Sequence, residues 1–220
     1  MPQTREAIDH AKAANVPMIV GSNRTEASVF LGGNPSIVNL DEASLQQRVQ
    51  ALVPAGEGPS TIDMYRRLYP QAKRGGGLYR ASADRGGFRG TPVLAGRKAD
   101  QNAAPVWVYQ FYRATPLEGG RYHTPHASEI PFVFDTLSRA TSIGGEPTAN
   151  AQNLADRMSA AWANFARNGD PNAGSGGGKT PNWPKYSSAK RETMVWDESP
   201  AGPRIENDPR AEQRKRMLSY

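Results

Sequence analysis

The stretch that decides the fold is Val16-Pro17-Met18-Ile19-Val20-Gly21-Ser22-Asn23-Arg24-Thr25-Glu26. It begins with a short apolar run closed by glycine, which is the pattern of a buried β-strand, and continues as a polar turn. In open α/β sheets the carboxyl ends of the strands face the ligand crevice. Glu26 is therefore a candidate functional carboxylate, although an acidic residue at this place also fits a surface position or a helix cap.

Two further segments have the character of strands. Residues 106–112, Val-Trp-Val-Tyr-Gln-Phe-Tyr, are nearly continuous in apolar character, which is typical of a strand covered on both faces. Residues 193–196 form a shorter run of the same kind. Helical patterns lie between these segments, so the sequence predicts an α/β fold with a few mostly parallel strands, flanking helices and long loops.

The spacing of apolar residues, together with start and stop signals, predicts the helices. They are expected at residues 45–53, at 60–69 with Ser60 and Asp63 as an imperfect capping box, at 83–98, at 151–167, and after a cap formed by Asp208 and Pro209. We expect the third of these helices to kink at Pro92, and residues 75–77 to form a glycine loop.

Composition sets the outer limits. The chain has 220 residues, of which 37% are apolar and 22% are charged, so it is long enough for a sizeable core and is not disordered throughout. This length suits one domain or part of a larger one. The absence of cysteine excludes disulfides, thiolate metal sites and a cysteine nucleophile, and only three histidines are present. We therefore expect neither a bound metal nor a cofactor.

The charge balance does not indicate a nucleic-acid partner. The formal net charge is +6, but the basic residues are scattered, and the one dense run, residues 210–216, is interrupted by Glu212. No apolar stretch approaches the length of a membrane span, and the first ten residues lack the apolar core of a signal peptide. The sequence selects neither export nor the cytoplasm.

One glycine-rich segment matches a phosphate-binding loop only loosely. Ala173-Gly-Ser-Gly-Gly-Gly-Lys179-Thr180 fits that pattern if alanine replaces its first glycine. A phosphate-binding loop leaves a strand and opens a helix, whereas this one follows a helix and runs into Pro181 and Pro184. We expect no nucleotide site here.

A second candidate functional residue is His126. It stands at the end of a long polar connection, residues 113–125, and leads into Ala-Ser-Glu-Ile-Pro-Phe-Val-Phe at residues 127–134. Loops carry many catalytic groups, yet a single loop histidine is more often structural or exposed. His123 and His10 are weaker candidates on position alone.

Taken together, these segments resemble the C-terminal portion of type B carboxylesterases, the cholinesterase-like branch of the α/β-hydrolase fold. The resemblance covers nearly the whole chain in order, and its most specific part is residues 126–134. The other matching segments are residues 16–26, 84–97, 104–111, 161–172 and 182–186. Thr25 and Ala27 differ from the aspartate and glycine usual in that family.

The resemblance implies a serine-type hydrolase acting on a small-molecule carboxylic ester. It assigns Glu26 as the triad acid and His126 as the general base, and it places Val29 and Phe30 in the substrate-binding lining. No G-x-S-x-G nucleophile motif occurs in the sequence, and neither Ser22 nor Ser128 lies in a strand-to-helix elbow.

The resemblance also implies that residues 1–220 form a single incomplete domain. Such a chain would hold the acid and the base without the nucleophile, would be inactive alone, and would have the N-terminal part of the domain as its partner. The alternative is a catalytically inactive α/β-hydrolase remnant that acts as an interaction module, because an uncovered strand edge and apolar surface favour association.

Overall fold

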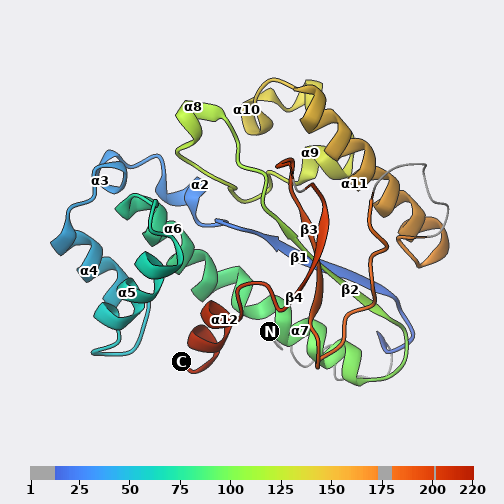
Figure 1. Cartoon of the computed structure of the whole chain (residues 1–220), viewed down its shortest axis with the longest axis horizontal. Helices are drawn as coiled ribbons and strands as arrows, with labels where there is room; N and C mark the ends of the chain where they lie inside the picture. Colours follow the sequence, from blue (N-terminus) through green and yellow to red (C-terminus); the bar gives the residue numbers. More distant parts are fainter. Residues whose placement is uncertain (1–12, 173–179, 201) are drawn as a thin grey trace.

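The computed structural model describes residues 13–172, 180–200 and 202–220 (Figure 1). Among these residues a sheet of four strands has the order β1-β2-β3-β4. Strands β1 (Met18–Asn23), β2 (Val106–Phe111) and β3 (Glu192–Trp196) are parallel, and β4 (Arg204–Asn207) runs antiparallel to β3. The predicted α/β fold with a few mostly parallel strands is confirmed, while the antiparallel β4 was not predicted.

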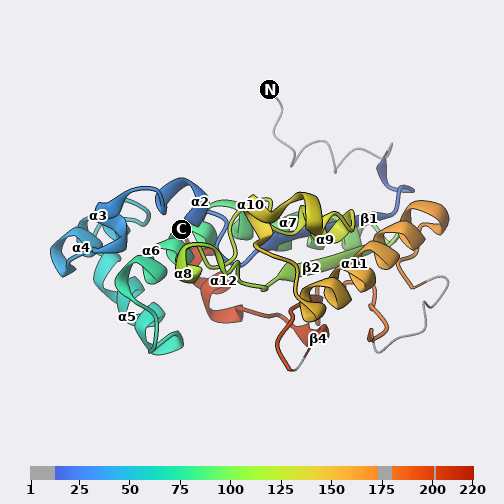
Figure 2. The same ribbon diagram turned by 90° about the horizontal axis from the view of Figure 1, so that it is seen from above.

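The helices flank this sheet. In chain order they are α2 (Ser28–Leu31), α3 (Pro35–Val38), α4 (Glu42–Gln50), α5 (Gly58–Leu68), α6 (Arg74–Ala83), α7 (Arg89–Asp100), α8 (Leu117–Gly120), α9 (Ile130–Val133), α10 (Thr141–Gly144), α11 (Ala149–Asn168) and α12 (Ala211–Leu218). A π-helical turn at Asp84–Phe88 joins α6 to α7, and a 3₁₀ turn lies at Leu137–Arg139. In both views α3 to α6 gather beyond the carboxyl end of β1 (Figures 1 and 2).

Strand β2 has apolar side chains on both faces, as its sequence predicts. Trp107 and Phe111 are buried in the main core with residues of α9 and α11, whereas Val106 and Val108 pack with residues of α7 on the other side. In Figure 1, α11 and α7 accordingly lie on opposite sides of the strands. The alternation follows from the two-residue period of side chains along a strand.

The sheet has two different edges. Among the described residues β1 pairs only with β2, and its own sequence, Met-Ile-Val-Gly-Ser-Asn, contains no charge or proline that would discourage further pairing. The opposite edge is β4, in which the side chains of Arg204 and Glu206 form an ion pair at 2.7 Å. A short, charged strand of this kind protects an edge.

Two expectations about the glycines and prolines are wrong. Residues 75–77 are not a loop but lie within α6, where a Cβ at Gly75 would fall 2.7 Å from the Ile37 carbonyl oxygen. Glycine therefore permits α6 to approach α3 closely. The helix breaks at Gly86, whose φ of −86° and ψ of −109° are not helical, rather than at Pro92. Pro92 lies in the first turn of α7, where amide donors have no partner within the helix.

Two predicted helix caps are also wrong. Helix α5 begins at Gly58, and the hydroxyl of Ser60 donates to the Glu57 carbonyl from within the first turn. Helix α12 begins after Arg210, which has a left-handed φ of 64°. The Asp208 carboxylate instead accepts two hydrogen bonds, at 2.7 and 2.6 Å, from the guanidinium of Arg214.

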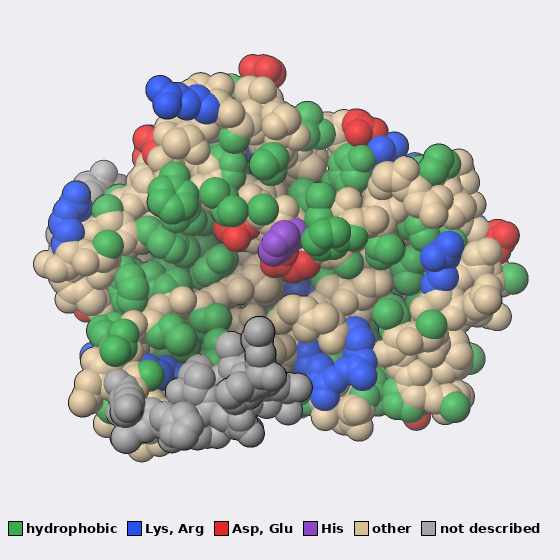
Figure 3. Space-filling view, turned by 180° about the vertical axis from the view of Figure 1, so that it is seen from behind, with side chains coloured by type: hydrophobic (Ala, Val, Ile, Leu, Met, Phe, Trp, Pro, Cys, Tyr) green, Lys and Arg blue, Asp and Glu red, His purple; other side chains and the backbone are tan. Residues whose placement is uncertain are grey.

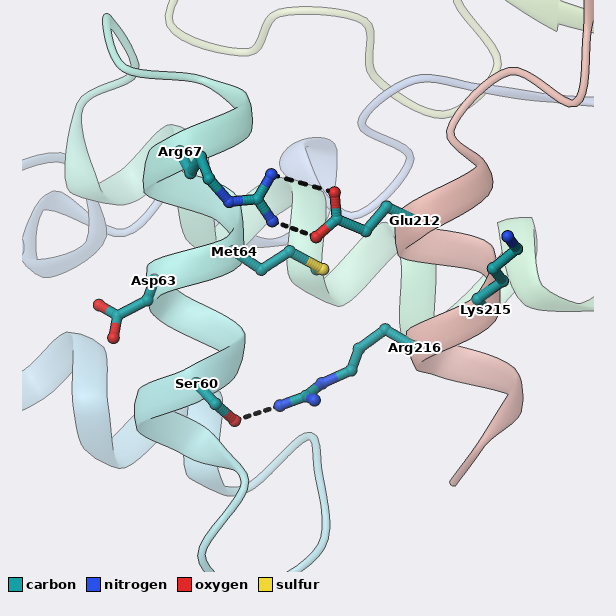
Figure 4. Close-up of a pocket in the computed structure, with 7 residues that line it drawn as sticks. All are labelled: Ser60, Asp63, Met64, Arg67, Glu212, Lys215 and Arg216. Atoms are coloured by element: carbon teal, nitrogen blue, oxygen red, sulfur yellow. Dashed lines mark hydrogen bonds and ion pairs between the residues drawn. The ribbon is translucent and has the colours of Figure 1, made fainter.

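An open groove lies between helices α5 and α12, and residues of both helices line it (Figure 4). At one end of the groove Arg67 pairs with Glu212, and at the other Arg216 contacts Ser60 and Glu57. These ion pairs are largely exposed, and such pairs contribute little to stability. The fully buried Met217 packs with residues of α5 and α6 and anchors the helix more firmly.

Two sequence features lie outside the described residues: the glycine-rich segment 173–179, including Lys179, and His10. None of the described helices combines the length and the apolarity needed to cross a bilayer.

Candidate active site

The carboxyl end of β1 passes into a turn that is joined to the distant loop before α9. Thr25 is fully buried in this turn, and its amide and hydroxyl both donate to the Thr124 carbonyl, at 3.1 and 3.0 Å. The Thr124 amide donates in return to the Thr25 hydroxyl at 2.8 Å. Three hydrogen bonds therefore fix the two loops to each other at positions directly before Glu26 and two residues before His126.

Glu26 and His126 meet in this structure. Oε2 of Glu26 lies 2.6 Å from Nδ1 of His126, and the His126 amide donates to the Glu26 carbonyl at 3.3 Å. The carboxylate is 19% exposed and the imidazole 62%. A carboxylate beside Nδ1 favours the neutral tautomer with its proton on Nδ1, which leaves Nε2 free to accept a proton.

The second oxygen of Glu26 is also held. Oε1 accepts a hydrogen bond of 2.5 Å from the main-chain amide of Asn23, the last residue of β1. The orientation of the carboxylate is therefore set by the sheet on one side and by His126 on the other. A carboxylate held at both oxygens is already oriented toward the imidazole, so no free energy is needed to reorganise it during the reaction.

On the face drawn in Figure 3, apolar side chains surround an exposed histidine side chain. Val29 and Phe30, the two residues assigned to the substrate lining, are 45% and 74% exposed on α2, and the Phe30 ring centroid lies 6.0 Å from that of His126. Beyond His126, Ile130 and Phe134 are 48% and 70% exposed. A group of exposed apolar side chains is typical of a ligand-binding or interaction surface.

The structure adds two residues that sequence reasoning missed. The Asn23 side chain, which is fully buried, donates to the Pro125 carbonyl at 2.7 Å and to Oε2 of Glu129 at 2.5 Å. Burial raises the pKa of the Glu129 carboxyl, although the hydrogen bond from Asn23 acts in the opposite direction. The only sequence signal for Glu129 is its place as a lone charge in the apolar stretch that follows His126.

His123 has a different environment from His126. It is partly buried, its ring meets that of Tyr79 edge to face at 6.2 Å, and it has a left-handed φ of 54°. Burial, and then the positive charges of Arg80 and Arg24, lower its pKa to about 4. The ring contact with Tyr79 and the lowered pKa indicate that His123 packs against its neighbours as a neutral side chain.

The two serines near the site are buried. Ser22 is 6% exposed and accepts a hydrogen bond of 2.8 Å from Gln110, while Ser128 is 3% exposed and donates to the Pro125 carbonyl at 2.7 Å. Both hydroxyls are thus engaged in holding the strands and the histidine loop. Within the described ranges, no group of three or more histidine, aspartate or glutamate side chains is placed to hold a metal ion.

Comparisons with known proteins agree on one family. The model of the carboxylesterase family matches residues 1–216. The para-nitrobenzyl esterase of Bacillus subtilis is 27% identical over 98% of this chain and 40% of its own length. Carboxylesterase 1C of Rattus norvegicus is 33% identical over 84% of this chain and 35% of its own length.

Solved structures agree with the sequence comparisons. The Geobacillus stearothermophilus carboxylesterase EST55 superposes with a TM-score of 0.78 at 27% identity, over 96% of this chain and 42% of the other. A structure titled PNB esterase superposes with a TM-score of 0.66 at 25% identity, over 97% and 40%. The chain therefore spans about 40% of the length of these relatives.

Proposed function

This chain belongs to the carboxylesterase family, and we propose that it supplies the acid, Glu26, and the base, His126, of a serine-type carboxylic ester hydrolase. The observation that carries the proposal is the 2.6 Å contact between Oε2 of Glu26 and Nδ1 of His126. These residues are 100 positions apart in the sequence and meet at the carboxyl end of β1, where ligands bind in open α/β sheets.

The reaction needs each of these groups. A serine hydroxyl is a poor nucleophile at neutral pH, so Nε2 of His126 takes its proton as the oxygen attacks the ester carbonyl. Glu26 keeps the proton of the neutral ring on Nδ1 and then stabilises the imidazolium. The imidazolium returns its proton to the leaving alcohol, and a water molecule, activated in the same way, hydrolyses the acyl intermediate.

The apolar residues beside His126 supply a binding surface for the ester. The exposed Phe30 ring lies 6.0 Å from the imidazole between centroids, and Val29, its neighbour on α2, is also an exposed apolar side chain. An apolar acyl or alcohol group would be removed from water there, at about 25 cal/mol per Å² of buried apolar area. We therefore assign these two residues to substrate binding.

The nucleophile and the oxyanion donors belong, in this proposal, to a partner segment. The sequence holds no G-x-S-x-G motif, and about 60% of the length of the Bacillus subtilis para-nitrobenzyl esterase lies outside the part that this chain matches. Because β1 has an unpaired apolar edge among the described residues, the partner segment would add a strand beside it. Without that segment we expect the chain to be inactive.

Hydrolysis of a chromogenic short-acyl ester tests the proposal. The chain is assayed alone and then with a polypeptide that carries the nucleophile-bearing part of the domain. Activity should depend on that partner and should be lost with His126→Gln, while Asp63→Asn, at a side chain that is 76% exposed on α5, should leave it unchanged. Activity of the chain alone that survives His126→Gln would contradict the proposal, and assembly without any hydrolysis would favour an interaction module.

A further inference from the structure

Asn23 is the point at which the acid and base loops are tied together. It is the last residue of β1, is fully buried, and uses its main chain and its side chain for different partners. The main-chain amide holds Oε1 of Glu26 at 2.5 Å. The side-chain amide donates to the Pro125 carbonyl at 2.7 Å, and Pro125 immediately precedes His126.

The same side chain reaches a second carboxylate. Nδ2 of Asn23 lies 2.5 Å from Oε2 of Glu129, which is three residues beyond His126, and 3.4 Å from the hydroxyl of Ser128. Its donors therefore engage the chain on both sides of His126. In contrast, Oδ1 of Asn23 is buried and has no hydrogen-bond partner within the described part of the chain. A buried acceptor without a partner does not stabilise the fold, so the stabilising contribution of this amide comes from its donor, Nδ2.

We propose that Asn23 is a positioning residue that fixes His126 against Glu26 and holds the Glu129 carboxylate beside this pair. The inference rests on the proposed function, because the orientation of His126 matters for catalysis only if the imidazole acts as a base. Asn23 itself touches neither the imidazole nor any reacting atom, so its effect passes through Pro125 and Glu26.

The charges around this point explain why an amide is needed. Two acidic residues meet at this point: Glu26, which the Asn23 main-chain amide holds, and Glu129, which the Asn23 side chain contacts. Burial, and then the charges of Glu129 and Glu26, raise the pKa of the Tyr109 hydroxyl. A neutral donor at position 23 can satisfy a carbonyl and a carboxylate at once. An aspartate there would be a third carboxylate facing two acceptors, and it would repel both.

Nitrogen NMR of the imidazole rings in the full chain tests this role directly. In the unaltered chain, neutral His126 should have its proton on Nδ1. In Asn23→Asp, His126 should leave Glu26, and the fraction with the proton on Nδ1 should fall by about half or more as Nε2–H molecules accumulate. The matched control is Asn102→Asp, which makes the same chemical change at an exposed amide that donates to the nearby Asp100 carbonyl.

His123 serves as an internal reference for the fold. Its enclosed ring should give unchanged signals in Asn23→Asp if Asn23 positions the pair specifically. If His126 keeps its Nδ1 proton, or if His123 changes to the same extent, the proposal is overturned. Should Asn23→Asp fail to fold, Asn23→Ser, which is smaller and uncharged, is read by the same two criteria. The readout needs no hydrolysis, so it separates this inference from the proposed esterase activity.

Discussion

The aromatic ring of Tyr109 lies directly against Gly21. The two residues are partners in the register of β1 and β2, and a Cβ built on Gly21 would clash with the Tyr109 ring. The Tyr109 ring also packs edge to face against Trp162, with 5.2 Å between the ring centroids. The end of β1 that leads to Glu26 is thus packed without spare room.

Gly21→Ala should destabilise the fold. The added methyl group must displace the Tyr109 ring, and overpacking of this kind typically costs about 1–3 kcal/mol. The free energy of unfolding measured by urea denaturation checks this. Gly33→Ala is the control, because a Cβ at Gly33 meets nothing within 4 Å. Equal stability of the two variants would contradict the described packing.

Glu26→Gln should nearly abolish ester hydrolysis in the chain assembled with its nucleophile-bearing partner. An amide cannot stabilise the imidazolium, and the corresponding loss in a serine protease lowers turnover by about 10⁴. The turnover number on a chromogenic ester is the measurement. Asp63→Asn makes the same change at a carboxylate that is 76% exposed on α5 and should have no effect. Activity retained in Glu26→Gln would remove Glu26 from the mechanism.

Two phenylalanines near His126 should respond in opposite ways. Phe132 is fully buried, with its ring 5.1 Å from that of Phe111, so Phe132→Ala should cost about 3–5 kcal/mol of stability. Phe30 is 74% exposed, so Phe30→Ala should leave the free energy of unfolding nearly unchanged and raise KM for apolar esters. A large loss of stability in Phe30→Ala would show that Phe30 is a core residue rather than a substrate contact.

His123 should make the fold less stable in acid. Because its pKa is lowered from 6.5 to about 4, the unfolded chain binds a proton in this interval that the folded chain does not. Stability from this residue is therefore complete above pH 6.5 and falls as the pH drops toward 4. Thermal unfolding across this range should be less pH-dependent in His123→Asn, because asparagine has no group that titrates there. Asparagine is chosen because it tolerates the left-handed φ of this position. Parallel curves for the two proteins would contradict the assignment.

Asp84→Asn should be strongly destabilising. The fully buried Asp84 accepts a hydrogen bond of 2.5 Å from the Tyr65 hydroxyl and pairs with Arg210, which is itself buried. Removing one partner of a buried pair leaves an uncompensated charge and costs about 3–5 kcal/mol. Glu212→Gln is the control, because it breaks the exposed pair with Arg67 (Figure 4) and should not change the unfolding curve measurably. A similar loss of unfolding free energy in both variants would contradict the stronger role of the buried pair.

The sheet could be predicted where apolar runs are continuous. Residues 16–21 and 106–112 have this pattern because their strands are packed on one or both faces, and strands form there at Met18–Asn23 and Val106–Phe111, the first displaced by two residues from the expected range. Strand β4 has the sequence Arg-Ile-Glu-Asn, with one apolar residue. It is held by pairing with β3, where Ile205 lies opposite Met194, and a sequence pattern does not record such a partner.

The helical layer shows where local preference was overridden. Three consecutive glycines, residues 75–77, favour a loop on propensity alone. They are helical here because α3 and His123 pack closely against α6, and a Cβ at Gly76 would fall 3.1 Å from Nε2 of His123. The helical conformation of residues 75–77 therefore depends on contacts with residues far away in the sequence.

The site was only partly predictable. Position alone did not separate Glu26 from a surface residue or His126 from an ordinary loop histidine, and only the family resemblance brought them together as a pair. Asn23 and Glu129 were missed because they meet across 106 positions, and neither has an unusual local pattern. Their relationship depends on how the turn after β1 lies against the loop before α9.

The two edges of the sheet differ in how readily they could pair with an additional strand. Within the portion of the chain that the structure describes, one edge is the charged, antiparallel β4 and the other is β1, which continues the parallel part of the sheet. Parallel strands end on a common side, so whatever stands at the tip of an appended strand arrives close to Glu26 and His126. In the proposed assembly, this open edge is therefore the flank from which a reactive hydroxyl would reach the imidazole.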